Sequence, residues 1–234
     1  MKQNSYIPDC DDCSLEYNSV FKYLTKDEMD RVNYEKKCCH YKRGKILYNE
    51  GSRINGCYCI NKGIIKIYKT GIDGKGQIIR FAKSGDIIAY RSVLSNETAC
   101  TSAKIIEDSV FCFIPGNTLV SLIKNNGEFS MEMIKLICRE LGEANSYITD
   151  IAQKTVRGRL AEILVHLKSE FGLNDNGVLK ISLTRKELAN IIGTATESVI
   201  RLLSEFKNDS LIELNARQIK ILDEQGLIRT SNLF

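Results

Sequence analysis

The sequence lacks the features that would place the chain in a membrane or in a secretory pathway. Its 234 residues include no tryptophan and only two prolines, and no apolar run is long enough to cross a bilayer. The first ten residues, MKQNSYIPDC, hold no apolar core flanked by basic residues, so they do not indicate a signal peptide. We therefore expect a cytoplasmic protein without a membrane partner, whose nine cysteines are reduced thiols.

The motifs of common enzyme classes are also missing. We find no phosphate-binding loop, no nucleophile elbow and no HExxH zinc motif, so we predict that the protein is not an enzyme and has no catalytic residues. The net charge of +4 is too small to predict nucleic-acid binding by itself. A hydrophobic content of 43% suits one large domain or two ordinary ones.

Short strands separated by glycines occupy the first half of the chain. Between residues 39 and 114, apolar and polar side chains alternate with a period of two, and glycines interrupt the alternation. This spacing predicts an antiparallel β-roll or barrel, which we place at residues 39–117. Before it, residues 1–38 are expected to form a polar arm with one short helix, capped by Thr25.

The pattern becomes helical after Pro115. A long helix is predicted over residues 129–151, with apolar residues spaced alternately three and four apart. Such a seam is typical of a coiled coil and favours a homodimer, although a helix packed on its own β-roll would also explain it. We place the dimerisation helix and linker at residues 118–154, followed by a C-terminal domain at 155–234. The predicted dimer residues are Ile134, Ile137, Leu141, Ala144, Ile148 and Ile151.

Two short amphipathic helices with a tight turn are predicted over residues 183–203. Thr184 and Glu187 are spaced as a capping box, and Gly193 suits the left-handed turn between the helices. Ala189 is small and Val199 is β-branched, so two helices can cross closely here. The pattern is typical of a DNA-reading helix-turn-helix. Alternation at 211–214 and 218–222 adds a two-stranded wing, and a further strand is expected over 179–183.

The outward face of the second helix offers base-reading side chains. Arg201 can bind guanine through two hydrogen bonds, and Glu197 can accept one from cytosine. Thr184 and Arg185 are expected to contact phosphates. An ordinary helical hairpin, in which the acid and the base pair in solvent, is the alternative. The predicted DNA-binding residues are Thr184, Arg185, Thr194, Thr196, Glu197, Ser198 and Arg201.

This order of parts resembles the CRP/FNR family of bacterial transcription regulators over nearly the whole chain. The residues that carry the resemblance are Lys62-Gly63, Gly85-Asp86, Val156-x-Gly158-Arg159-Leu160-Ala161, Leu183-Thr184-Arg185-x-Glu187-Leu188-Ala189 and Thr196-Glu197-Ser198-Val199-x-Arg201-Leu202-Leu203. The resemblance implies an α+β fold with an N-terminal antiparallel β-roll of the cupin-like jelly-roll type. A long dimerisation helix and a C-terminal winged helix-turn-helix domain would follow it.

The same resemblance implies a homodimeric, sequence-specific transcription regulator. Its partners would be double-stranded DNA and RNA polymerase, and Glu197 and Arg201 would match the family's base-reading pair. The cAMP receptor has an arginine where this sequence has Thr196, so the operator need not be the same.

The nucleotide-binding residues of the cyclic-nucleotide members are not matched. Their ribose-binding glutamate falls on Tyr90, and their phosphate-binding Arg-Ser pair falls on Cys100 and Thr101. A neutral cysteine cannot replace a bidentate cation, so we do not expect cAMP to bind in the usual way. Arg91 is one place away from Tyr90 and could serve another anion. The expected effector pocket comprises Gly85, Asp86, Tyr90, Arg91, Cys100 and Thr101.

The cysteines suggest an alternative function as a redox or iron–sulfur sensor. Oxygen-sensing members of the family hold a [4Fe–4S] cluster with three N-terminal cysteines and one in the β-roll. Cys10 and Cys13 match the first two places and Cys112 the last, and these three are the predicted metal ligands. The third place is Ser19, a poor ligand, for which Cys38 or Cys39 could substitute if the arm folds back. A zinc site, a disulfide or an unknown effector remains open.

Overall fold

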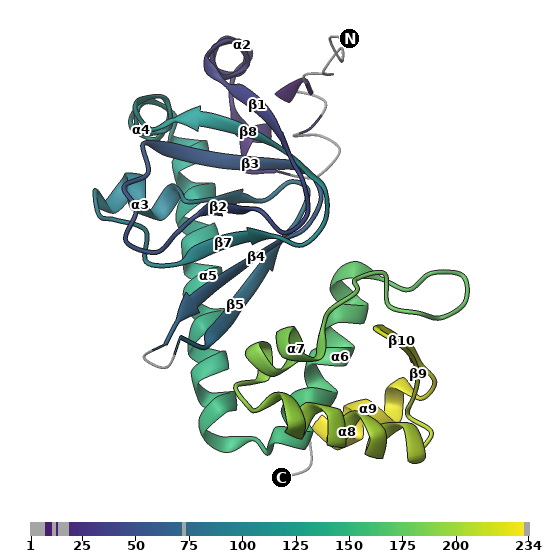
Figure 1. The fold of residues 1–234 in the computed structure, drawn as a ribbon. Helices are drawn as coiled ribbons and strands as arrows, with labels where there is room; N and C mark the ends of the chain where they lie inside the picture. Colours follow the sequence, from purple (N-terminus) through teal and green to yellow (C-terminus); the bar gives the residue numbers. More distant parts are fainter. Residues whose placement is uncertain (1–7, 11–12, 14–18, 72–73, 232–234) are drawn as a thin grey trace. The chain divides into compact units, whose positions relative to one another are not determined.

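The computed structural model describes residues 8–10, 13, 19–71 and 74–231, and Figure 1 shows its ribbon. The chain divides into two compact units, Met1–Leu141 and Gly142–Phe234. The division falls inside the 27-residue helix α5 (Gly127–Gln153), earlier than the boundary expected near residue 154. The last turns of α5 belong to the second unit, in which the Tyr147 hydroxyl donates a 2.9 Å hydrogen bond to the Ile191 carbonyl.

Two antiparallel four-stranded sheets build the first unit, which confirms the predicted β-roll (Figure 1). The first sheet consists of β1 (Lys37–Tyr41), β8 (Ser109–Pro115), β3 (Gly56–Lys62) and β6 (Ile87–Ile88), in that order. The second consists of β2 (Ile46–Tyr48), β7 (Ser102–Ile105), β4 (Ile65–Thr70) and β5 (Gly76–Ala82).

The core of the first unit has two parts because side chains alternate across each strand. One part includes Ile60, Ile65, Ile105 and Phe111, all almost fully buried. The other lies on the opposite face of β3 and β8, where helices cover the sheet. Each large apolar side chain buried in this way contributes about 1.5–3 kcal/mol relative to exposure.

The helices of the first unit precede and follow the strands, except for one that lies between β6 and β7. They are the 3-10 turn η1 (Val20–Tyr23), α2 (Lys26–Glu35), α3 (Tyr90–Ser95) and α4 (Gly116–Asn125), together with the first part of α5. Thr25 caps α2 with the capping box that it makes with Glu28. The short helix α3 was not predicted, because six residues are too few to establish a helical period.

The second unit is a winged helix-turn-helix, as predicted. Its elements are α6 (Val156–Phe171), α7 (Arg185–Ile192), α8 (Thr196–Asn208), β9 (Ile212–Asn215), β10 (Gln218–Ile221) and α9 (Glu224–Ser231). The strand expected over 179–183 is wrong, since that segment contributes only an isolated bridge between Leu173 and Leu179. The last helix, α9, was not predicted. No helix in the described part of the chain has the length and apolarity of a membrane span.

Candidate nucleic-acid interface and thiol pocket

The turn between α7 and α8 has the geometry that its sequence predicts. The Thr184 hydroxyl accepts a 3.1 Å hydrogen bond from the Glu187 amide, and the Glu187 carboxylate accepts one of 3.0 Å from the Thr184 amide. Gly193 ends α7 in the left-handed conformation, with φ +67° and ψ +52°, and its amide donates to the Ala189 carbonyl. Since a residue with a Cβ adopts this conformation only at a cost, glycine fixes the turn.

One face of α8 is buried and the other is exposed. Val199, Leu203 and Phe206 are at most 1% exposed, and they seat the helix against the rest of the unit. Glu197, Ile200 and Arg201 lie on the opposite face and are exposed. Thr194, Thr196 and Ser198, at and near the start of the helix, are partly exposed. The structure therefore brings most of the predicted base-reading residues to one accessible end of α8.

Arg201 pairs along its own helix, but not with Glu197. Its guanidinium lies 2.6 Å from the Glu205 carboxylate, and 68% of the Arg201 side chain is exposed. Glu205 also accepts from Arg157 of α6 at 2.8 Å, and Arg157 stacks 4.7 Å from the centre of the Phe206 ring. Glu197 takes part in no ion pair with the described residues. The proposed base-reading acid is thus accessible, and the arginine is held only by a surface pair.

The predicted phosphate contacts at the start of α7 are already partly engaged. The Thr184 hydroxyl serves the helix cap, as described above. One Arg185 nitrogen donates a 2.9 Å hydrogen bond to the Ala216 carbonyl at the tip of the wing. Another, Nη1, is buried without a hydrogen-bond partner in the described part of the chain. Arg185 therefore joins α7 to the wing.

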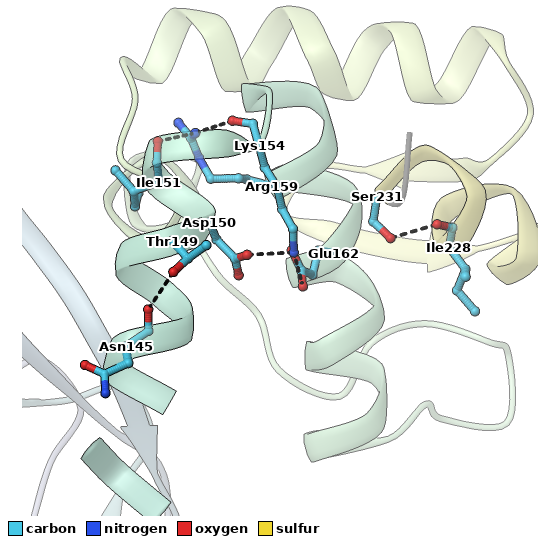
Figure 2. A network of polar contacts seen from close by, with 9 residues as sticks. All are labelled: Asn145, Thr149, Asp150, Ile151, Lys154, Arg159, Glu162, Ile228 and Ser231. Atoms are coloured by element: carbon cyan, nitrogen blue, oxygen red, sulfur yellow. Dashed lines mark hydrogen bonds and ion pairs between the residues drawn. The ribbon is translucent and has the colours of Figure 1, made fainter. Parts of the chain in front are cut away.

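A polar network fixes the junction of α5 and α6, and Figure 2 shows it from close by. Arg159 donates to the Lys154 carbonyl at 2.7 Å and to the Ile151 carbonyl at 3.3 Å, which satisfies the last carbonyls of α5. Its Nε atom donates to the Ile192 carbonyl at the end of α7. Lys154 pairs with both Asp150 and Glu162. Arg159, part of a motif that the sequence singled out, thus connects α6 to two helix ends.

The apolar seam of α5 is exposed along its length. Ile134 is 52% exposed, Leu141 61% and Ile148 65%. The other predicted members are also exposed, namely Ile137, Ala144 and Ile151. The alternative in which this stripe packs on its own β-roll therefore does not hold.

The residues of the expected effector pocket each have contacts or surroundings of their own in the structure. Tyr90 is buried, and its hydroxyl donates to the Glu140 carboxylate of α5. The Arg80 guanidinium lies 2.9 Å from the same carboxylate. Arg91 pairs with Glu97 at 3.1 Å on the surface. The four remaining residues have other surroundings: Cys100 is exposed, Thr101 bonds the Tyr48 side chain, Asp86 accepts from the Lys83 amide, and Gly85 borders the pocket of thiols described next.

Four cysteines line one pocket of the first unit. They are Cys10 and Cys13 of the arm, Cys59 of β3 and Cys112 of β8. Lys36 lies 3.1 Å from the Cys10 sulfur, and the Asn61 amide lies 3.6 Å from the Cys13 sulfur. Burial raises the pKa of the Cys59 and Cys112 thiols, so both are protonated when nothing is bound. The sequence identified three of these cysteines as candidate ligands and missed Cys59.

The β-roll, the long helix with its exposed seam and the winged helix-turn-helix define a class of DNA-binding transcription regulators with a sensor domain. Comparison with known families agrees. Residues 38–126 match the cyclic nucleotide-binding domain, and residues 158–230 match the Crp-like helix-turn-helix domain. The chain belongs to the CRP/FNR family of transcription regulators.

Relatives and solved structures fit this assignment. The chain is 26% identical to the transcriptional activator protein Anr of Pseudomonas protegens, over 92% of this chain and 88% of that protein. It is 24% identical to the fumarate and nitrate reduction regulatory protein of Yersinia pestis, over 97% and 92%. A regulator of the crp/fnr family from Eubacterium rectale has the same fold, with a TM-score of 0.77 and 18% identity over 93% of this chain and all of that one. These relatives are transcription regulators rather than enzymes.

Proposed function

We propose that this regulator binds double-stranded DNA as a homodimer and reads its operator through Glu197 and Arg201 of α8. The observation that carries the proposal is that α8 has two opposite faces. One face buries Val199, and the other exposes the Glu197 carboxylate and the Arg201 guanidinium. Arg201 would leave Glu205 to bind guanine O6 and N7, and Glu197 would accept from cytosine N4. The hydroxyls of Thr194, Thr196 and Ser198 add contacts at the same helix end.

The homodimer is proposed to form through the seam of α5. A row of exposed isoleucines with one leucine on a 27-residue helix is costly in water, and a second copy of the same helix would cover it by coiled-coil packing. Two copies related by a two-fold axis would present two α8 helices to paired half-sites. RNA polymerase, which a transcription regulator must influence, is the further partner we propose.

The test measures DNA affinity for an operator obtained by selection from random sequences. Glu197→Ala and Arg201→Ala should each weaken binding by about 5- to 150-fold, which corresponds to about 1–3 kcal/mol, and should relax base preference. Arg229→Ala is the matched control, because it removes an exposed arginine from α9 and should leave affinity within twofold. Equal affinity of the unaltered protein for selected and scrambled DNA would refute the proposal.

We further propose that the β-roll does not bind cAMP in the usual way. Tyr90, at the place of the ribose-binding glutamate, is buried and committed to Glu140, and Arg91 is committed to Glu97. In addition, Cys100 offers no charge for a phosphate. Calorimetric titration with cAMP should detect no binding, and a micromolar dissociation constant would contradict the assignment.

As the sensing group we propose a [4Fe–4S] cluster at the thiol pocket, with Cys10, Cys13 and Cys112 as ligands. The donor set fits, because cysteine sulfurs are the ordinary ligands of such clusters, and nearby N–H groups of Lys36 and Asn61 can donate to them. When bound, the cluster supplies a redox-active group. The space that water can enter between these thiols is about 20 Å³, room for about one water, so the arm must shift outward to admit a cluster.

Hydrogen bonds hold the described residues of the arm. The Cys10 amide donates to Asn33 at 3.0 Å, the Lys36 ammonium reaches the Cys10 sulfur and the Pro8 carbonyl, and Asn61 reaches Cys13. These contacts place the thiols over the sheet and allow movement at the cost of a few hydrogen bonds. Protein purified under anaerobic conditions should contain iron and acid-labile sulfide. Absence of both after reconstitution would exclude the cluster and leave the DNA-reading proposal intact.

A further inference from the structure

The pocket that holds Cys10, Cys13 and Cys112 contains one more thiol than the sequence assigned to it. Cys59 of β3 lines the same pocket, and Ser19, at the place where the resemblance expects a third N-terminal cysteine, lines it as well. A serine hydroxyl keeps its proton at neutral pH and is a poor ligand for iron, whereas a thiol readily releases its proton to water when it binds a metal. The donor set is therefore incomplete without Cys59.

The strand register brings Cys59 to Cys112. The two residues are direct partners in the antiparallel pairing of β3 with β8, and Cys38 of β1 is the partner of Cys112 on its other side. Neighbouring strands lie about 4.8 Å apart, so the side chains of Cys59 and Cys112 leave one face of the sheet side by side. Cys10 and Cys13 of the arm line the same pocket as this pair.

We propose that Cys59 is the fourth thiolate ligand of the group that Cys10, Cys13 and Cys112 bind. The inference rests on the proposed [4Fe–4S] cluster and names the ligand that replaces the one missing at Ser19. Two ligands would come from the arm and two from the sheet. Each thiol gives its proton to solvent as it binds iron.

The charge around the pocket suits thiolate ligands. The Lys36 ammonium, 3.1 Å from the Cys10 sulfur, also interacts with Cys38 and Cys112. A protonated lysine offsets part of the negative charge that four thiolates bring into a partly buried site. The Asn61 amide donates to Cys13. Donors to ligand sulfurs are the contacts that tune iron–sulfur sites in general.

The other cysteines of the sheet provide matched comparisons. Cys57 lies on the same strand and the same face as Cys59, two residues away, but it is fully buried in the core and does not line the pocket. Cys38 shares a hydrogen bond with Cys112 but does not line the pocket either. Cys39 is exposed and alternates to the other face of β1. Among Cys38, Cys39, Cys57 and Cys59, it is Cys59 that both lies on the right face and lines the pocket.

A single metal ion is the competing occupant. A tetrahedral zinc site with Zn–S distances of about 2.3 Å requires sulfurs about 3.8 Å apart. In the described part of the chain, no three Cys, His, Asp or Glu side chains are grouped closely enough to hold one ion. Either occupant therefore requires the side chains to move, and the experiment must identify the bound group by its composition.

The test compares Cys59→Ala, Cys57→Ala and Cys38→Ala in the full-length protein. Each is reconstituted anaerobically with ferrous iron, sulfide and a thiol reductant, then desalted. Iron, sulfide and zinc are measured per chain, and visible absorption and the electron paramagnetic resonance of the reduced sample are recorded. The unaltered protein, Cys57→Ala and Cys38→Ala should hold about four iron and four sulfide per chain, as expected for one cluster. Cys59→Ala should hold at least tenfold less iron and sulfide per chain.

The outcomes separate the inference from the proposal beneath it. A normal cluster in Cys59→Ala, or its loss in Cys38→Ala alone, would overturn the role of Cys59 and leave the cluster standing. A protein that takes up no iron and sulfide would overturn the cluster and this inference together. If the unaltered protein holds one zinc ion per chain and Cys59→Ala holds none, the cluster would be refuted and Cys59 would remain a ligand. Cys59→Ser, nearly the same size, gives a second test if the alanine variant does not fold.

Discussion

Which side of α8 faces the protein can be tested by comparing two neighbouring residues. Val199 is fully buried on the inner face of α8, whereas the next residue, Ile200, is 51% exposed on the side of Glu197 and Arg201. Removing one buried methylene costs about 0.5–1.5 kcal/mol, so Val199→Ala, which removes two methyl groups, should cost about 1–3 kcal/mol. Ile200→Ala removes more atoms but should cost about 0.5 kcal/mol or less, because much of its side chain is in water.

Amide hydrogen exchange measures this difference within the second unit. In Val199→Ala, the protected amides of α7 and α8 should exchange about 5- to 150-fold faster, since each 1.4 kcal/mol corresponds to a factor of ten. The same amides in Ile200→Ala should change by less than about threefold. Amides of β8, in the other unit, serve as the internal control. Exchange that is accelerated more by Ile200→Ala than by Val199→Ala would place the wrong face of α8 inside and remove the basis for the proposed base contacts.

Three further predictions concern the seam, the packing of α8 and the thiol pocket. Leu141→Lys should shift the sedimenting mass toward the 26.4 kDa monomer and weaken operator binding. Ser146→Lys, on the opposite face of α5, should change neither the mass nor the binding. An unchanged mass for Leu141→Lys would reject the seam as the dimer interface. Arg157→Ala should destabilise the second unit by about 1 kcal/mol, because it removes a partly exposed ion-pair network and the stacking on Phe206, and an unaltered urea midpoint would contradict this. Adding Ser19→Cys to Cys59→Ala should restore iron and sulfide, since position 19 borders the same pocket; a double variant that stays empty would show that this position does not reach the bound group.

Local patterns in the sequence were sufficient for most of the elements. The capping box at Thr184 and the left-handed turn at Gly193 depend on residues within a few positions of each other, and both were predicted correctly. The β-roll followed from the period of two, and the exposed face of α8 followed from the apolar residues on its other side. Helix α9 and the irregular segment at 179–183 were missed, because packing against the rest of the unit decides them more than their own propensity does.

The sequence by itself thus determined the fold class, the helix-turn-helix and the residues that α8 exposes. Only the tertiary structure decided which distant residues meet. Strand register places Cys59 beside Cys112, and Cys10 of the arm lines the same pocket. Arg185 donates a hydrogen bond to the wing, and Glu140 of α5 accepts one from the Tyr90 hydroxyl. The physical reason is that periodicity reports only which face of an element is apolar. Which partner that face meets depends on register and crossing, and these are set by the packing of the whole unit.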